Sequence, residues 1–271
     1  MNILISNDDG VFAPGILAAK QAVEDLANVT VVAPDENNSS VGRRITLFKH
    51  LKINSCELED GSSAYSVSGS PADAIIVGVN YIMEEKPDLV ITGINQGVNI
   101  SCDITSSGTV CAALESVSLG IPAIAVSLFM DPETSFKQDE NGEWYTDYDF
   151  TLTKKVLHDL VLKIKNEGFP KGVDLFNLNV PSNYDSKEVK ITHLSHKMLD
   201  KEVIDNNNQE KEELFNYSLD ESQCSDDLVM ITSALVQEYD RNSDGYALIV
   251  EKRPSLTPLS VNMTFKDLKY W

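Results

Sequence analysis

The chain carries two adjacent carboxylates, Asp8 and Asp9, at the end of a short apolar run, with Asn7 before them and Gly10 after them. Adjacent carboxylates repel each other unless a cation or a hydrogen-bond donor compensates their charge. A divalent ion such as Mg²⁺ or Mn²⁺ is one such compensator, because it takes oxygen ligands. The alternative is that one aspartate merely caps the next helix. Taken alone, the pair is equally compatible with both interpretations.

A second polar segment, residues 93–99, follows the apolar residues 89–92. Its glycines allow the backbone to approach a ligand closely. The side-chain amides of Asn95 and Asn99 are able to reach a metal ion or a phosphate. This segment therefore adds polar ligand groups at the end of another expected strand.

A third polar segment, Ser106-Ser107-Gly108-Thr109, opens the helix that we expect at residues 109–119. Free backbone N–H groups and the helix dipole at such an N-terminus attract phosphate. A serine that caps the helix without any ligand explains the same residues equally well.

The elements that must position these segments follow from hydrophobic patterns in the first half of the chain. We expect strands at residues 3–5, 29–33, 89–92 and 123–126, and helices at residues 16–26, 71–83 and 109–119. Such strands are typical of a sheet with both faces covered, so we predict a three-layer, Rossmann-like α/β fold with a mostly parallel sheet. Ligands bind at the carboxyl ends of parallel strands. The carboxylates, amides and helix start therefore converge, which favours a ligand site.

The remaining segments are less regular. We expect extended segments at residues 45–53, 64–67, 174–180 and 255–259, helices at residues 150–166 and 228–239, and a hairpin turn at Asn141-Gly142. Residues 200–227 hold ten acidic and two basic residues, which predicts a solvated protrusion. We divide the chain into an α/β core, residues 1–195, and a C-terminal acidic protrusion and β-rich arm, residues 196–271.

The composition excludes several classes of partner. A formal net charge of −20 argues against a nucleic-acid polymer, because nothing would neutralise its phosphates. A small phosphorylated substrate stays compatible, since a bound divalent cation reverses the local field. No apolar run approaches the ~20 residues of a membrane-spanning helix, and the N-terminus lacks the pattern of a signal peptide. We expect no membrane association, a cytoplasmic location and reduced thiols at the four cysteines.

Other chemistry-bearing patterns are absent or incomplete. The sequence has no phosphate-binding Gly-x-x-x-x-Gly-Lys loop, no dinucleotide-binding Gly-x-Gly-x-x-Gly after the first strand and no Gly-x-Ser-x-Gly of a serine hydrolase. The stretch from Asp240 to Glu251 satisfies the pattern of a calcium-binding EF-hand loop. Because Pro254 would interrupt the exiting helix, we interpret that match as chance.

Six motifs occur along the chain in the order that is typical of one known family. They are Asn7-Asp8-Asp9-Gly10, Ala33-Pro34-Asp35, Gly69-Ser70-Pro71-Ala72-Asp73, residues 93–99, Ser107-Gly108-Thr109-Val110 and residues 255–259. Together they resemble the signatures of the SurE family of survival-protein nucleotidases. The resemblance spans nearly the whole chain and is densest in its N-terminal half. Ser40, Ser101 and Ser106 depart from the residues that the family usually has at these positions.

The resemblance implies a metal-dependent phosphomonoesterase that acts on nucleoside 5′- and 3′-monophosphates, a 5′/3′-nucleotidase of the acid-phosphatase-like kind. It implies one divalent cation per subunit, Mg²⁺ or Mn²⁺, with the ligands Asp8, Asp9, Ser39 and Asn95. It implies a phosphate site formed by Asn99, Ser107, Gly108 and Thr109, and a homodimer or homotetramer built through the C-terminal arm. The catalytic residues would be Asp8, Asp9 and Asn95, although a ligating carboxylate is a weak base for the attacking water. The alternative from another class is a non-catalytic nucleotide- or metal-binding module.

Overall fold

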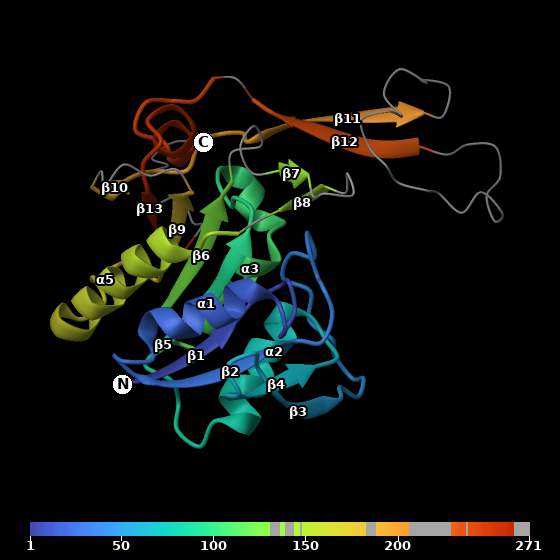
Figure 1. Ribbon diagram of the computed structural model, residues 1–271, viewed down its shortest axis with the longest axis vertical. Helices are drawn as coiled ribbons and strands as arrows, with labels where there is room; N and C mark the ends of the chain where they lie inside the picture. Colours follow the sequence, from blue (N-terminus) through green and yellow to red (C-terminus); the bar gives the residue numbers. More distant parts are fainter. Residues whose placement is uncertain are drawn as a thin grey trace, which may run out of the picture.

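A nine-stranded sheet forms the centre of the molecule. The computed structural model describes residues 1–130, 136–138, 144–146, 148–182, 188–205, 229–236 and 238–262. The strands of the central sheet are β1 (Asn2–Ser6), β2 (Asn28–Pro34), β3 (Ile53–Glu57), β4 (Ser63–Val67), β5 (Leu89–Gln96), β6 (Ala123–Phe129), β9 (Leu175–Pro181), β10 (Lys190–Ile191) and β13 (Ser255–Leu259). They lie in the order β10-β13-β9-β6-β5-β1-β2-β4-β3, and Figure 1 shows this arrangement.

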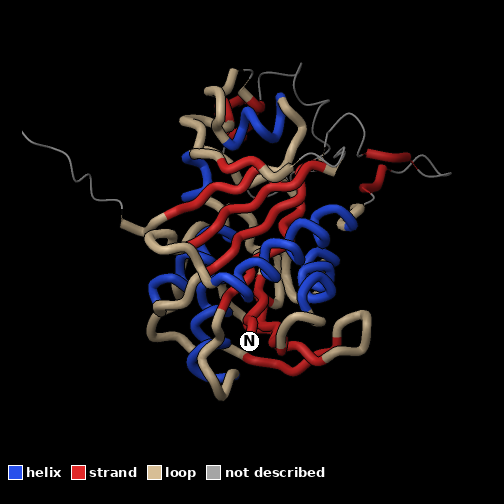
Figure 2. The backbone as a smooth tube through the Cα atoms, turned by 90° about the vertical axis from the view of Figure 1, so that its left-hand side faces the viewer, coloured by secondary structure: helices blue, strands red, loops and turns tan. Residues whose placement is uncertain are grey.

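Helices and two small ribbons surround the sheet. The helices are α1 (Pro14–Val23), α2 (Pro71–Val77), α3 (Gly108–Ser118) and α5 (Thr151–Glu167), together with the π-helical turns η1 (Gly78–Ile82) and η5 (Tyr246–Val250) and the 3₁₀ turn η2 (Cys102–Thr105). The two ribbons are β7 (Phe136–Gln138) with β8 (Trp144–Thr146), and β11 (Leu199–Asp205) with β12 (Val229–Leu235). Figure 2 shows helices to both sides of the strands.

The interior of the sheet is parallel. Strands β9, β6, β5, β1, β2 and β4 pair in parallel with their neighbours in this run. Strand β3 is antiparallel to β4, and β13 is antiparallel to β9. The prediction of a three-layer, mostly parallel α/β fold is confirmed. All the parallel strands of the run end at the same edge, so residues that follow them gather there.

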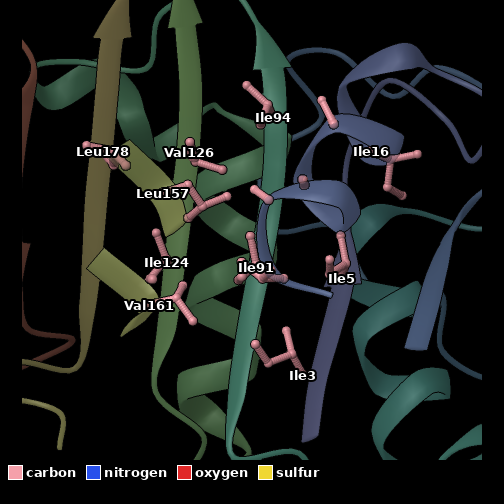
Figure 3. Packing of buried hydrophobic residues seen from close by; sticks show 14 of the residues in the cluster. Ile3, Ile5, Ile16, Ile91, Ile94, Ile124, Val126, Leu157, Val161 and Leu178 are labelled. Carbon is pink, nitrogen blue, oxygen red and sulfur yellow. The ribbon is translucent and has the colours of Figure 1, made fainter. Parts of the chain in front are cut away.

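Strand β1 shows how one strand serves both helical layers. Ile3 and Ile5 pack into the core beneath α1 and α5, together with Ile16 and Leu157 from those helices, as Figure 3 shows. Leu4 packs into the core on the opposite face, with α2 and α3. Because successive side chains of a strand point to opposite faces, this apolar run is buried on both sides.

Sequence patterns alone did not give the correct bounds of every strand. The strand expected at residues 45–53 is wrong in its first part, because β3 begins only at Ile53 and the preceding residues form a loop. In this loop the Thr46 N–H donates to Asp73 Oδ1 at 2.8 Å. A side chain therefore accepts the hydrogen bond that a neighbouring strand would accept in a sheet. Strand β5 continues beyond Thr92, through a register shift, to Gln96. Bulges of this kind redirect side chains near sites.

The helix expected at residues 228–239 is wrong. Residues 229–235 form strand β12, which pairs antiparallel with β11, with Val203 opposite Ile231. The β-branched residues of this segment lose side-chain freedom in a helix and fit a strand. Only the partner strand, distant in sequence, decides between the two structures.

Other expectations fall partly outside the described residues. Strands β7 and β8 pair antiparallel around the hairpin turn expected at Asn141-Gly142, and the turn itself lies outside the described residues. The same holds for most of the acidic stretch at residues 200–227, of which residues 200–205 belong to β11. The division of the chain at residue 195 stays a prediction. Strand β13, from the C-terminal part, lies inside the central sheet between β10 and β9.

Three cysteines in the described part of the chain, Cys56, Cys102 and Cys111, carry free thiols, as expected. Cys224 lies outside the described residues. Among the described helices, none combines the length and the apolar character that crossing a membrane requires.

A close approach between α1 and β5 gives a test of the packing. A Cβ atom added to Gly15 would lie 2.0 Å from the backbone oxygen of Ile94. We predict that Gly15→Ala lowers the free energy of unfolding by about 1–3 kcal/mol, because overpacking outweighs the roughly 1 kcal/mol by which alanine favours a helix. Urea unfolding measures this, with the exposed Gln21→Ala in the same helix as a control that stays within about 0.5 kcal/mol. A Gly15→Ala protein as stable as the wild type would contradict this packing.

Candidate functional site

The turn after β1 is closed by one buried side chain. Asn7 Nδ2 donates to the Gly10 backbone oxygen at 2.8 Å, and the Gly10 N–H donates to Asn7 Oδ1 at 3.2 Å. These two bonds hold Asp8 and Asp9 at the carboxyl end of β1. Helix α1 begins after Ala13, and no side chain caps it. Neither Asp8 nor Asp9 therefore caps α1, which was the alternative to a metal site in the sequence analysis.

Asp8 packs directly against the first turn of α3. The Thr109 hydroxyl donates a hydrogen bond to Asp8 Oδ1. A Cβ atom at Gly108 would lie 2.7 Å from both the Cβ and the Oδ2 of Asp8, so only glycine fits there. The carboxylate turn and the start of α3, which are about a hundred residues apart in sequence, thus form one unit.

The two carboxylates share an environment that disfavours their charge. Burial raises the pKa of Asp8 above its ordinary value. Burial, followed by the neighbouring charge of Asp8, raises the pKa of Asp9 to about 6. Asp9 Oδ2 is buried and has no hydrogen-bond partner in the described part of the chain. A buried carboxylate oxygen without a donor is the group that a cation satisfies, so these residues fit a metal ion.

The other two expected ligands line the same cavity as the aspartates, which has a volume of about 350 Å³. The Asn38 N–H donates to the Asp8 backbone oxygen at 2.7 Å, which brings Ser39 to the cavity wall. Asn95 Nδ2 donates to the Gly97 backbone oxygen at 2.9 Å, so the amide oxygen is what the side chain offers to a cation.

No group of three or more His, Cys, Asp or Glu side chains suited to a metal occurs among the described residues. A cation at this site would therefore take mixed oxygen ligands from two carboxylates, a hydroxyl and an amide. Mg²⁺ and Mn²⁺ accept such a set, because both prefer oxygen ligands.

The start of α3 combines a cap with room for an anion. Ser107 is the N-cap residue, and its hydroxyl accepts a hydrogen bond from the Val110 N–H at 3.1 Å. The first N–H groups of any α-helix lack partners within the helix, and this cap satisfies one of them. Ser107 also lines the cavity. Capping and anion binding, which the sequence presented as alternatives, are compatible here.

Asn99 is held by a network that sequence reasoning missed. Its N–H donates to Asn179 Oδ1 at 2.9 Å, and its backbone oxygen accepts from Asn177 Nδ2 at 2.7 Å and from Asn179 Nδ2 at 2.8 Å. Its own Nδ2 donates to Ser127 Oγ at 2.9 Å. Asn177 and Asn179 are completely buried on β9. The sequence did hold a signal for this network, because two asparagines occupy alternate positions of the otherwise apolar strand β9.

A second anchor comes from the C-terminal part of the chain. Ser101, with a φ of 61°, donates its N–H to Asp244 Oδ2 at 2.8 Å. The N–H groups of Ser195 and Gly245 each donate to Asp244 Oδ1 at 2.7 Å. Asp244, which lies within the calcium-loop pattern, thus fixes the strained serine beside the cavity. Glu251, from the end of that pattern, pairs with Lys190 at 2.8 Å.

The β11–β12 ribbon also reaches the cavity, which the sequence did not indicate. Met198, Leu199, Lys201 and Ile231 line it. Lys201 Nζ lies 2.6 Å from Asp103 Oδ1, and the Met198 N–H donates to Asp103 Oδ2 at 3.2 Å. Sequence analysis placed these residues in or beside the acidic protrusion, away from the site.

The structure therefore brings together all eight expected site residues, as cavity-lining groups or as direct neighbours of one. Asp8, Asp9, Ser39, Asn95, Asn99 and Ser107 line the cavity, and Thr109 bonds to Asp8. Gly108 contributes through its lack of a side chain, which lets α3 meet Asp8. These features place the chain among the three-layer α/β proteins whose ligand site lies at the carboxyl edge of a parallel sheet.

Comparison with known proteins identifies the family. Residues 3–201 match the family model described as Survival protein SurE, and the chain belongs to this family. A protein named 5′-nucleotidase SurE from Methanobrevibacter smithii is 47% identical over 199 residues, which cover 73% of this chain and 76% of the relative. A protein of the same name from Methanosphaera stadtmanae is 38% identical over 264 residues, 97% of this chain and 96% of the relative.

The fold comparison agrees with the family. The crystal structure of the SurE protein from Aquifex aeolicus superimposes with a TM-score of 0.74 and 32% sequence identity. The match covers 97% of this chain and 95% of that chain. The similarity therefore includes the C-terminal part as well as the residues of the family model.

The raised pKa of Asp9 gives a stability prediction for the metal-free protein. Because its pKa is about 6 when folded and about 3.8 otherwise, the folded state holds this proton more tightly, and stability is lost as the pH rises through that window. We predict that Asp9→Asn raises the free energy of unfolding at pH 8 in EDTA by about 1–2 kcal/mol.

Urea unfolding at pH 4 and pH 8 measures the effect, which should nearly vanish at the lower pH. Asp35→Asn, which changes an exposed carboxylate after β2, is the matched control and should leave stability unchanged at both values. Equal or lower stability of Asp9→Asn at pH 8 would show that Asp9 carries no uncompensated charge.

Proposed function

We propose that the chain is a metal-dependent phosphomonoesterase that hydrolyses nucleoside 5′- and 3′-monophosphates to nucleoside and phosphate. The observation that carries this proposal is the direct contact between Asp8 and the first turn of α3. It joins a cation-demanding carboxylate pair to an anion-binding helix start within one cavity. The relatives named 5′-nucleotidase SurE, one of which aligns over 97% of this chain, support the 5′-nucleotidase part of this activity.

One divalent cation per subunit, Mg²⁺ or Mn²⁺, belongs to this proposal. Asp8, Asp9, Ser39 and Asn95 would hold it, and the buried Oδ2 of Asp9 supports this assignment. When bound, such an ion supplies positive charge that polarises the phosphoryl group and the attacking water.

The chain's own groups perform the remaining tasks. The N–H groups at the start of α3 bind the phosphoryl oxygens and meet the negative charge that develops on them. Ser107 and Asn99 line the same cavity and position the phosphate. The Thr109 hydroxyl fixes the orientation of Asp8. Asp8 or Asp9 orients the attacking water by accepting its hydrogen bond, while a carboxylate that binds a cation is a weak base.

The substrate class, the cellular location and the assembly of the chain are part of the same proposal. The substrate is a small nucleotide and not a nucleic-acid polymer, which the net charge of −20 supports. We further propose a cytoplasmic homodimer or homotetramer. Sedimentation of the purified full chain tests the assembly, and a monomer at working concentration would contradict it.

The activity test is phosphate release from AMP and from p-nitrophenyl phosphate. We predict turnover with added Mn²⁺ or Mg²⁺, loss of turnover in EDTA and recovery when the ion is restored. Asp8→Asn should lower kcat/KM by about 100-fold or more and weaken Mn²⁺ binding, because it removes a charged ligand and leaves the fold intact. The control Asp35→Asn should keep wild-type activity.

Two outcomes would contradict the proposal. Full activity of Asp8→Asn would place the metal site elsewhere. Absence of phosphate release across a panel of divalent ions and nucleotides would favour the non-catalytic binding module, provided that circular dichroism shows folded protein.

A further inference from the structure

One face of the β11–β12 ribbon forms part of the cavity wall. Leu199, Lys201 and Val203 occupy alternate positions of β11, and Val203 lies opposite Ile231 on β12. Alternate residues of a strand and directly opposed residues of an antiparallel pair share a face. The cavity lining contains Leu199, Lys201 and Ile231, so this face is the one turned to the site. In Figure 1 the ribbon lies at the top of the molecule, at the end to which β5 and β6 point.

This face is unusually apolar for an exposed surface. Ile231 is 74% exposed and Val203 is 66% exposed. Met198, just before β11, lines the cavity together with Leu199 and Ile231, whereas Val203 lies outside the lining. The rest of the lining is largely polar or charged, with Asp9 and Ser107 as examples. The cavity therefore has a polar end suited to phosphate and an apolar wall that neither a metal nor a phosphate requires.

Asp103 anchors the ribbon beside the cavity. Lys201 Nζ contacts Asp103 Oδ1 at 2.6 Å, and Asp103 Oδ2 accepts hydrogen bonds from the Met198 N–H and the Ser101 hydroxyl, each at 3.2 Å. Lys201 is the one cationic side chain among the residues that the structure places in the cavity lining. It compensates Asp103, so that this carboxylate does not add to the repulsion of an incoming phosphate.

We propose that this ribbon face recognises the nucleoside half of the substrate, with Met198 and Ile231 in contact with the base. The inference rests on the proposed function and adds its specificity element. A base is the occupant that fits, because its flat apolar surface packs on aliphatic side chains while its phosphate reaches the start of α3 in the same cavity. A volume of about 350 Å³ lies within the ~300–1,000 Å³ range of small-molecule pockets.

The test compares AMP with ribose 5-phosphate, which carries the same phosphate and sugar without the base. In the full chain with Mn²⁺, Ile231→Ser should raise KM for AMP about 10-fold and leave kcat/KM for ribose 5-phosphate within about twofold. Ile231→Leu, which keeps an apolar side chain, should retain wild-type values for AMP. Ile191→Ser on β10, at a residue 62% exposed and outside the cavity lining, is the matched control and should change neither substrate.

The outcomes separate this inference from the proposed function. Equal losses on both substrates, or no loss on either, would overturn the role of the ribbon. If the wild type turns over neither substrate, the ribbon is tested by binding alone. AMP and ribose 5-phosphate are then titrated into the protein with Mn²⁺ by calorimetry. Tighter binding of AMP than of ribose 5-phosphate that disappears in Ile231→Ser would support the ribbon although catalysis had failed. Equal binding of the two ligands by the wild type would overturn it.

Discussion

The contact between Asp8 and the first turn of α3 is the constraint on which the site depends. Gly108 allows the helix to approach the carboxylate, and Thr109 bonds to it. This contact places negative charge in a buried position beside a helix terminus that itself attracts anions. The hydrogen bonds from Thr109 favour the charged form of Asp8, yet burial outweighs them and raises the pKa of Asp8 above its ordinary value. If a cation binds the carboxylates and an anion binds the helix start, as proposed, their binding energies would be coupled through this one contact.

The loop between β5 and α3 completes the site, and its geometry is imposed from elsewhere. The asparagines of β9 hold both backbone groups of Asn99, and Asp244 holds the N–H of Ser101. These bonds span 80 and 143 residues of sequence. Breaking them would leave buried polar groups unsatisfied, which typically costs about 1–3 kcal/mol for each group. The C-terminal part of the chain is therefore required for the shape of the loop between β5 and α3.

Sequence predicted the parts of this arrangement that local rules determine. Apolar runs identified the parallel strands, and the polar residues after β1 and β5 marked the edge where the site forms. Ser39 came only from the family resemblance, because a serine in a polar loop carries no local signal. Asn179, Asp244 and Lys201 were missed because each acts through a partner far away in sequence. The error at residues 228–239 has the same cause, since pairing with β11 outweighs helical periodicity there.

The most direct test of the coupled site is calorimetric titration of Mn²⁺ into the full chain, with and without inorganic phosphate. Linkage requires that two ligands joined by one contact change each other's affinity by the same factor. The account predicts that phosphate tightens Mn²⁺ binding by about 10-fold, within the usual range of such couplings. It also predicts that Gly108→Ala removes this increase. Mn²⁺ affinity that is independent of phosphate would show that the carboxylate pair and the start of α3 are separate features.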